Sequence, residues 1–206
     1  MPFQDHLSRE VFDVKIAMVV FNGMTFLDFI GFYDVIARLK SCTEMNDTTW
    51  DICGIHEEVS DEHGMMVKVT RVKPDLKDYD MVFVPGGSGT RTLQSDDEFM
   101  NWFKGAAGTK FKVSACTGSL LLGAAGFLTD KRATTHPFHY DLLAPYCKEV
   151  VKSRLVRDGH VITGGGVAAS IDLGLYVLGL FVPDEQVQQI RKQMDYPYRQ
   201  RDIVTA

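Results

Sequence analysis

Residues 113–126 read VSACTGSLLLGAAG and carry more information than any other part of the chain. The apolar run FKVSA (111–115) predicts a short buried strand, and TGSLLLGAA (117–125) predicts a helix. Cys116 therefore lies at the turn between a strand and the N-terminus of a helix. The unpaired N–H groups and the dipole of the helix favour an anion there, so we expect a lowered thiol pKa and a reactive thiolate near neutral pH.

Two interpretations of Cys116 stay open at this point. It is a nucleophile, or it is a small apolar residue of the core, as free cysteines usually are. Gly118 favours a tight turn, because a glycine removes a side chain where the turn would crowd its neighbours.

Strands and helices alternate along the chain, which predicts an α/β fold with a parallel sheet covered by helices. Two segments depart from the alternation. EEVSDEHG (57–64) is predicted to be a turn that joins a strand at 49–56 to a strand at 65–72, and 149–166 is predicted to form two antiparallel strands that turn at Asp158-Gly159. The other expected strands are 15–21, 80–87 and 111–115, with a short extended piece at 132–137; the expected helices are 25–40, 96–107, 117–125, 138–146, 167–182 and 183–196.

Length and composition are those of one globular domain, expected over residues 1–206, since no repeat, low-complexity tract or linker interrupts the chain. The net charge of −5 and the lack of a lysine or arginine run argue against a nucleic-acid partner. The N-terminus has no signal-peptide core, and the longest apolar run (173–182) is too short for a membrane helix, so we expect a cytoplasmic protein. The four cysteines, at 42, 53, 116 and 147, indicate neither a disulfide framework nor a zinc site.

Candidate functional groups follow three of the expected strands, at the edge where open parallel sheets bind ligands. Asp28 stands in the apolar segment FLDFIGF (26–32), where burial would raise the pKa of its carboxyl and fit it for proton transfer. The alternative for Asp28 is an ordinary acid in the first turn of a helix. Cys116 and a glycine-rich loop at 85–89 are expected at the same edge.

The loop PGGSG (85–89) lacks the full phosphate-binding pattern and indicates a phosphate site only weakly. Its better use is a backbone N–H that forms half of an anion hole, with the N–H of Thr117 as the other half; the alternative is a plain turn. His136 and His139 are candidate bases for a Cys–His pair, or structural histidines.

Five segments together resemble the ThiJ/PfpI superfamily, and the resemblance extends from about Lys15 to Tyr196. It implies a flavodoxin-like fold related to class I glutamine amidotransferases, with a nucleophile elbow. Within the superfamily, the chain is most similar to isonitrile hydratases: an aspartate replaces the usual glutamate of the first helix, a threonine follows the cysteine, and ATTH and DLLAP segments are present. The five segments are LDFIG (27–31), VPGGSG (84–89), ACTG (115–118), RATTH (132–136) and TGGGVAASIDLGL (163–175).

The resemblance assigns roles to particular residues. Cys116 matches the nucleophile and Asp28 the carboxylate beside it. Thr117 matches the residue that supports the site through its hydroxyl and backbone N–H, Gly87 matches the loop donor, and His136 matches the general position of the amidotransferase histidine and is kept as an auxiliary candidate. Two departures from the family pattern, Phe32 and Pro137, are expected to border the pocket and to affect the size of the substrate.

The implied reaction is the addition of water to an isocyanide, which gives an N-substituted formamide through a cysteine thioimidate. Cys116 attacks the terminal isocyanide carbon, and Asp28 gives a proton and then acts as a base, which requires a pKa near neutrality. No metal or organic cofactor is implied, and a homodimer is. The alternatives are a glyoxalase- or deglycase-like enzyme acting on 2-oxoaldehydes and a ligand- or redox-sensing protein without enzymatic activity. The absence of a helix-turn-helix segment after Ala206 argues against a DNA-binding regulator.

Overall fold

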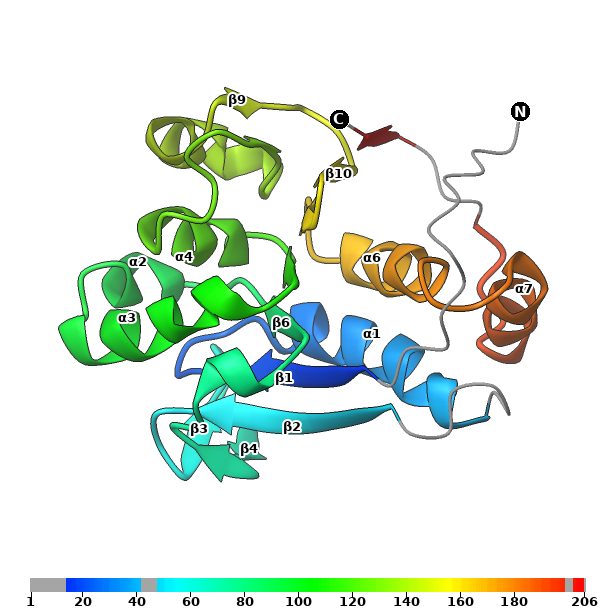
Figure 1. Cartoon of the computed structure of the whole chain (residues 1–206), viewed down its shortest axis with the longest axis horizontal. Helices are drawn as coiled ribbons and strands as arrows, with labels where there is room; N and C mark the ends of the chain where they lie inside the picture. Colours follow the sequence, from blue (N-terminus) through cyan, green and yellow to red (C-terminus); the bar gives the residue numbers. More distant parts are fainter. Residues whose placement is uncertain (1–13, 42–47, 199–201, 206) are drawn as a thin grey trace.

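The computed structural model describes residues 14–41, 48–198 and 202–205, so Cys42 and the ends of the expected single domain lie outside the described part. An eight-stranded sheet, in the order β12-β10-β11-β7-β6-β1-β2-β5, forms the centre of the molecule (Figure 1). Its strands are parallel except for β10 and β12. Strand β10 runs antiparallel to β11, and β12 pairs in parallel with β10. The bounds are β1 (Lys15–Val19), β2 (Thr49–Gly54), β5 (Arg71–Val72), β6 (Met81–Val84), β7 (Phe111–Ser114), β10 (Leu155–Asp158), β11 (Val161–Gly164) and β12 (Ile203–Thr205).

Helices cover both faces of this sheet, which confirms the flavodoxin-like α/β fold. Figure 1 shows α1, α6 and α7 grouped on one side of the strands and α2, α3 and α4 on the other. The bounds are α1 (Phe26–Ala37), α2 (Thr90–Leu93), α3 (Asp97–Phe103), α4 (Gly118–Ala124), α5 (Tyr140–Leu143), α6 (Ala169–Leu178) and α7 (Asp184–Gln193). No helix in the described part of the chain is long and apolar enough to span a membrane.

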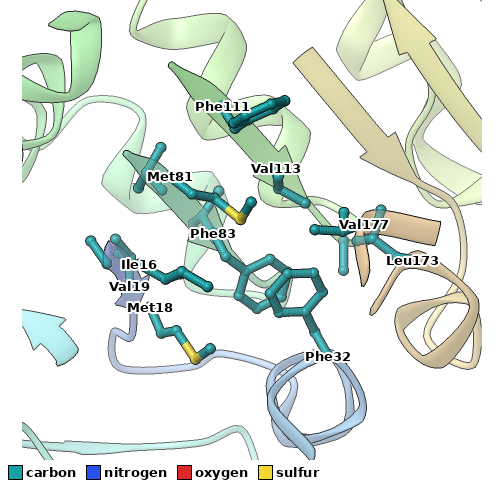
Figure 2. Close-up of a cluster of buried hydrophobic side chains, with 14 of the residues drawn as sticks. Ile16, Met18, Val19, Phe32, Met81, Phe83, Phe111, Val113, Leu173 and Val177 are labelled. Atoms are coloured by element: carbon teal, nitrogen blue, oxygen red, sulfur yellow. The ribbon is translucent and has the colours of Figure 1, made fainter. Parts of the chain in front are cut away.

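The core between the sheet and α1 is aromatic. Phe32 of α1 stacks on Phe83 of β6 with ring centroids 3.9 Å apart and planes 11° apart, and neither side chain is exposed (Figure 2). Such a pair adds about 1 kcal/mol to the free energy of burial alone. The expectation that Phe32 borders the pocket is therefore wrong: the ring fills the core, because its helix turns that face to the sheet. Pro137, by contrast, is exposed at the start of a short 3-10 turn.

Close packing of α6 on α1 fixes the position of the first helix. A Cβ on Gly31 would lie 2.2 Å from the Ser170 hydroxyl oxygen, and one on Gly174 would lie 2.8 Å from Val35 Cβ. The Ser170 hydroxyl in turn donates to the carbonyl of Leu27, in the first turn of α1, at 3.1 Å. Glycines at these two positions let the helix backbones approach, which holds the start of α1 at a defined place on the sheet.

The predicted pairing of 49–56 with 65–72 in a hairpin is wrong. Strand β2 pairs in parallel with β1 on one side and with β5 on the other, so both of its edges are used within the main sheet. The hairpin forms instead from β3 (Glu58–Ser60) and β4 (Met66–Lys68), so part of the segment predicted as a turn is a strand. The predicted antiparallel turn at Asp158-Gly159 is confirmed, with Gly159 at a φ of +64°.

Smaller differences concern the segment after α4. The extended piece contains β8 (Arg132–Ala133), which pairs in parallel with β9 (Glu149–Val150). The helix expected at 138–146 divides into a 3-10 turn (Pro137–His139), α5 and a second 3-10 turn (Ala144–Tyr146), because a proline is the first residue of one 3-10 turn and the second residue of the other. Sequence reasoning did not predict α2 or β12.

Candidate active site

Cys116 lies at the elbow between β7 and α4 in a strained conformation, with a φ of +52°. Its amide donates to the carbonyls of Gly164, at 3.0 Å, and Gly165, at 2.9 Å. Its carbonyl accepts the hydroxyls of Thr135, at 3.0 Å, and Ser119, at 3.2 Å. A positive φ at a residue other than glycine costs energy and persists only where the surroundings enforce it, as these four hydrogen bonds do here.

Gly118, the first residue of α4, allows this elbow to sit against the end of β6. A Cβ on Gly118 would lie 2.4 Å from the carbonyl oxygen of Val84 and 2.7 Å from that of Pro85. Because both neighbours are backbone atoms, no larger residue fits without moving the strand. The expectation of a crowded turn at Gly118 is confirmed.

Asp28 occupies the first turn of α1 and is completely buried. Its Oδ2 accepts the amide N–H of Gly86 at 3.0 Å, from the loop that follows β6. Its buried Oδ1 has no hydrogen-bond partner within the part of the chain that the structure describes. Asp28 is an acid in the first turn of α1, as the alternative expects, but its carboxyl accepts from the loop after β6 rather than capping its own helix.

Burial raises the pKa of the Asp28 carboxyl to about 7. Hydrogen bonds from Gly86 and from the Cys116 thiol act in the opposite direction, and the charge of Glu62 adds to the increase. The expected rise towards neutrality is thus present, and its main cause is the apolar surroundings of the first turn, as the sequence predicts.

The Asp28 carboxyl, Cys116 and the Thr117 amide all lie close to Gly86. A Cβ on this glycine would lie 2.5 Å from the Thr117 amide nitrogen and 2.8 Å from both Asp28 Oδ2 and Cys116 Cβ. The absence of a side chain at Gly86 is therefore what allows the carboxyl, the thiol-bearing residue and the first amide of the next helix to share one small volume.

The expectation of a lowered thiol pKa at Cys116 is wrong. Burial raises the pKa of the thiol above its ordinary value, and the neighbouring Asp28 charge acts in the same direction. The amide and hydroxyl of Thr117 lower it, as the N-terminus of a helix should, but by less. Cys116 is only 5% exposed, so loss of solvation outweighs the favourable dipoles.

The glycine-rich loop uses its amides within the protein, which argues against the weak indication of a phosphate site. All four amides from Gly86 to Gly89 donate to protein oxygens. Gly86 donates to Asp28 Oδ2 (3.0 Å), Gly87 to Thr117 Oγ1 (2.9 Å), Ser88 to Glu62 Oε1 (2.8 Å) and Gly89 to the carbonyl of Gly23 (3.0 Å). Gly87, the expected loop donor, is thus engaged by Thr117, whose hydroxyl also donates to the Gly87 carbonyl at 3.2 Å.

Glu62 is a part of the site that sequence reasoning missed. It lies in the turn between β3 and β4, where its carboxylate accepts the amide of Ser88 and, at 2.8 Å, the hydroxyl of Thr25. Burial raises the pKa of Glu62, but these hydrogen bonds together hold that pKa below its usual value. No motif marks this residue, because only the folded hairpin brings it to the loop and to Asp28.

His136 stands near the elbow but is not hydrogen-bonded to Cys116 within the described residues. Its Nδ1 accepts the amide of Phe138 at 3.2 Å, which caps the 3-10 turn that follows. The ring of His139 lies 5.6 Å from that of His136, and His139 Nε2 accepts a hydrogen bond from Arg91 at 2.8 Å. The structure thus brings Asp28, Thr117, Gly87 and Cys116 together. His136 follows Thr135, which contacts the Cys116 carbonyl, but His136 itself is bonded to Phe138.

Cysteine, histidine and carboxylate groups do not gather elsewhere as metal ligands. Within 14–41, 48–198 and 202–205, no three such side chains lie close enough to hold a metal ion. Cys53 is buried beside Tyr79, and burial raises the pKa of its thiol to about 12, while Cys147 is partly buried. Cys116 is therefore distinguished by its elbow and by its carboxyl neighbour.

Comparison with known proteins agrees with this fold. The model of the DJ-1/PfpI family matches residues 14–179. An isonitrile hydratase of Pseudomonas putida is 36% identical over 184 residues, which are 89% of this chain and 78% of that protein. The crystal structure of a THiJ/PfpI family protein from Pseudomonas syringae superposes with a TM-score of 0.83 at 30% identity, covering 97% of this chain and 83% of the other. Drosophila melanogaster DJ-1beta shares the fold, with a TM-score of 0.77 at 18% identity over 91% of this chain and 100% of its own.

Proposed function

Because this chain belongs to the DJ-1/PfpI family and has its fold, we propose that it is an enzyme that hydrates isocyanides to N-substituted formamides. The similarity to an isonitrile hydratase over most of both chains supports this choice of reaction. The observation that carries it is the Asp28 carboxyl, buried beside Cys116 with a pKa of about 7. A group that must give and take protons in one cycle works best with such a pKa.

The cycle starts with the ionised Asp28 carboxylate and the neutral Cys116 thiol. As the isocyanide carbon approaches the sulfur, the thiol proton passes to Asp28, so the thiolate forms only during attack. Asp28 then protonates the terminal carbon of the isocyanide while the C–S bond forms. The S–H bond is broken, C–H and C–S bonds are made, and the product is a thioimidate in which the nitrogen keeps a double bond to carbon.

Water completes the reaction with Asp28 again as the proton carrier. The carboxylate takes a proton from water as the oxygen attacks the thioimidate carbon, and it gives that proton to the nitrogen. The resulting tetrahedral adduct expels the cysteine sulfur, while its hydroxyl proton returns through Asp28 to the thiolate. The formamide leaves, and both residues are restored to their starting protonation states.

Thr117 supports the sulfur in this scheme. Its backbone amide lowers the pKa of the Cys116 thiol, so it stabilises the negative charge that develops on sulfur during attack. The Gly87 amide holds the Thr117 hydroxyl at 2.9 Å and acts on the reacting group through it. We assign no proton transfer to His136, because Asp28 accounts for each one.

The test is turnover of an alkyl isocyanide by the purified protein. Loss of the infrared isocyanide stretch and appearance of the formamide are followed for wild type, Cys116→Ala and Cys147→Ala, with circular dichroism as a check of folding. We expect turnover by wild type and Cys147→Ala and none by a folded Cys116→Ala. Consumption of methylglyoxal, with no loss of isocyanide, would reject the proposal in favour of a 2-oxoaldehyde enzyme; no reaction with either would favour a sensor.

A further inference from the structure

We propose that Arg91, His136 and His139 form an anion-binding cluster at the rim of the Cys116 site, and that this cluster recognises a carboxylate group carried by the substrate. That the other end of this substrate is an isocyanide rests on the proposed function. Anion binding at the rim does not depend on it. The three residues are called the rim cluster below.

The rim cluster is held together by one hydrogen bond and one ring contact. Arg91 of α2 donates from Nη2 to His139 Nε2 at 2.8 Å, which requires that nitrogen to be the unprotonated one. The rings of His139 and His136 lie 5.6 Å apart at 43°. Arg91 forms no ion pair with an acidic side chain in the part of the chain that the structure describes, although the protein carries a net charge of −5.

The charges around His139 are all of one sign. Burial lowers the pKa of the His139 imidazole, and both charged neighbours that act on it, Arg91 and His136, lower it further. A cation that lies next to two imidazoles and forms no ion pair with an acid among the described residues is a favourable place for a negative group. Arg91 is exposed, and a guanidinium that uses one N–H towards a histidine retains others in the forked arrangement that fits a carboxylate.

His136 connects the rim cluster to the elbow. The neighbouring Thr135 donates its hydroxyl to the Cys116 carbonyl at 3.0 Å. The His136 ring lies 3.6 Å from where a Cβ on Gly166 would stand, and the preceding Gly165 accepts the Cys116 amide at 2.9 Å. His136 is thus next in sequence to Thr135, which bonds the Cys116 carbonyl, and lies beside Gly166, which follows the residue that accepts the Cys116 amide.

Arg91 reaches the same rim from the other side. Its helix, α2, begins directly after the loop 86–89, and the Gly87 amide of that loop is bonded to Thr117 at the start of α4. Helix α4 also packs against α2 and against α5. The rim cluster therefore bridges the two chain segments that flank the elbow, at the edge of the sheet where Asp28 and Cys116 lie.

The electrostatics of the site favour a carboxylate bound at the rim and an uncharged reacting end bound inside. A carboxylate is disfavoured beside Asp28, which is buried and is ionised at the start of the proposed cycle. At the rim, the same charge would meet Arg91. A substrate with a neutral isocyanide at one end and a carboxylate at the other would thus bind in one orientation, with its carbon at Cys116.

The first experiment compares ω-isocyano carboxylates of two, three and four carbons with their methyl esters. We expect wild type and Arg157→Gln to prefer the acid in kcat/KM at the spacer that fits, and Arg91→Gln to lower the acid-to-ester ratio by about tenfold, as for loss of a charge-assisted hydrogen bond. Arg157 is a matched control, because it lies at the β10–β11 turn, at the opposite edge of the sheet. An unchanged ratio in Arg91→Gln would overturn the proposal.

The second experiment does not depend on turnover. In protein labelled at histidine, the ring signals of His136 and His139 should shift with sodium butyrate but not with butyramide or with sodium chloride of equal ionic strength, and His160 at the far edge should not respond. Arg91→Gln should abolish the shifts, and Arg157→Gln should keep them. Absence of butyrate-specific shifts in wild type would overturn the rim cluster as a carboxylate site. If butyrate shifts these signals but no isocyanide reacts, the proposed function fails and the rim site stands.

Discussion

The amide of Gly86 donates to Oδ2 of Asp28 at 3.0 Å, and this bond joins the first helix to the loop that follows β6. The same loop also accepts the amide of Thr25 at the carbonyl of Gly86, at 2.8 Å. Two hydrogen bonds between one glycine and the start of α1 thus place the carboxyl against the cysteine elbow. The proposed chemistry depends on this arrangement rather than on a helix dipole acting on the thiol alone.

Gly86→Ala should disrupt the site, because the new Cβ would lie 2.5 Å from the backbone nitrogen of Thr117. We expect activity to fall by at least about tenfold and the free energy of unfolding to fall by roughly 1–3 kcal/mol, as for overpacking elsewhere. Formamide production and urea denaturation measure the two effects. Gly105→Ala is the control, since its Cβ would meet only Leu76, at 3.9 Å, and its stability should change little. Wild-type activity in Gly86→Ala would show that the three groups do not need to converge.

Asp28→Asn should lose activity, and it should become more stable relative to wild type as the pH rises. The carboxyl pKa is raised from 3.8 to about 7 by burial, so between these pH values the folded chain holds a proton that the unfolded chain has released. The contribution of Asp28 to wild-type stability therefore declines as pH increases through this window, by up to about 4 kcal/mol, and the asparagine variant is spared this loss. Denaturation at pH 4 to 8 measures the difference, with the exposed Asp130→Asn as control. A stability difference that does not change with pH would contradict the raised pKa.

The thiol of Cys116 should titrate above the value of about 8.5 usual for a free cysteine, because burial and Asp28 both raise its pKa. The ultraviolet absorbance of thiolate in wild type minus that in Cys116→Ser gives the titration of this residue. A midpoint near or below neutrality would mean that the Thr117 amide and hydroxyl dominate, and that attack begins from a preformed thiolate.

Glu62→Gln should lower the pH at which activity appears. The scheme needs ionised Asp28, so kcat/KM should rise with pH through about 7 and then level off. The Glu62 charge raises the pKa of Asp28, and its removal should move the rise to lower pH while the amide oxygen still accepts from Ser88. Glu98→Gln, on the exposed surface of α3, is the matched control. An unshifted profile in Glu62→Gln would assign the rise to a group other than Asp28.

Much of the fold is predictable from local pattern. The buried runs at 15–21, 80–87 and 111–115 became β1, β6 and β7 with only their ends shortened, because continuous apolar runs of this length are typical of strands covered on both faces. The pairing of β2 could not be predicted in this way. Whether a strand joins the next strand in sequence or the main sheet depends on which edge is free, and β1 and β5 occupy both edges of β2.

In the site, too, some features follow from the local sequence and others depend on packing. The place of Cys116 and the burial of Asp28 follow from short segments, since each depends on the element in which the residue lies. The thiol pKa was predicted in the wrong direction, because the balance between desolvation and helix dipole depends on the 5% exposure that only packing reveals. Glu62 reaches the loop beside the site from a distant segment, the turn between β3 and β4. The homodimer implied by the family resemblance stays a prediction, which analytical ultracentrifugation of the full chain would check.

The most direct test of the account is capture of the covalent intermediate during hydration of a 13C-labelled isocyanide. Wild type, Asp28→Asn and Cys116→Ala are mixed with the isocyanide, quenched, and measured by intact-protein mass spectrometry, with the labelled carbon followed by NMR. We predict labelled formamide from wild type, no product and no adduct from Cys116→Ala, and little product from Asp28→Asn, because no group there carries the protons. The adduct in wild type should have the mass of the isocyanide added to one thiol and should map to Cys116. Product formation by Cys116→Ala, or turnover by Asp28→Asn near the wild-type rate, would contradict the account.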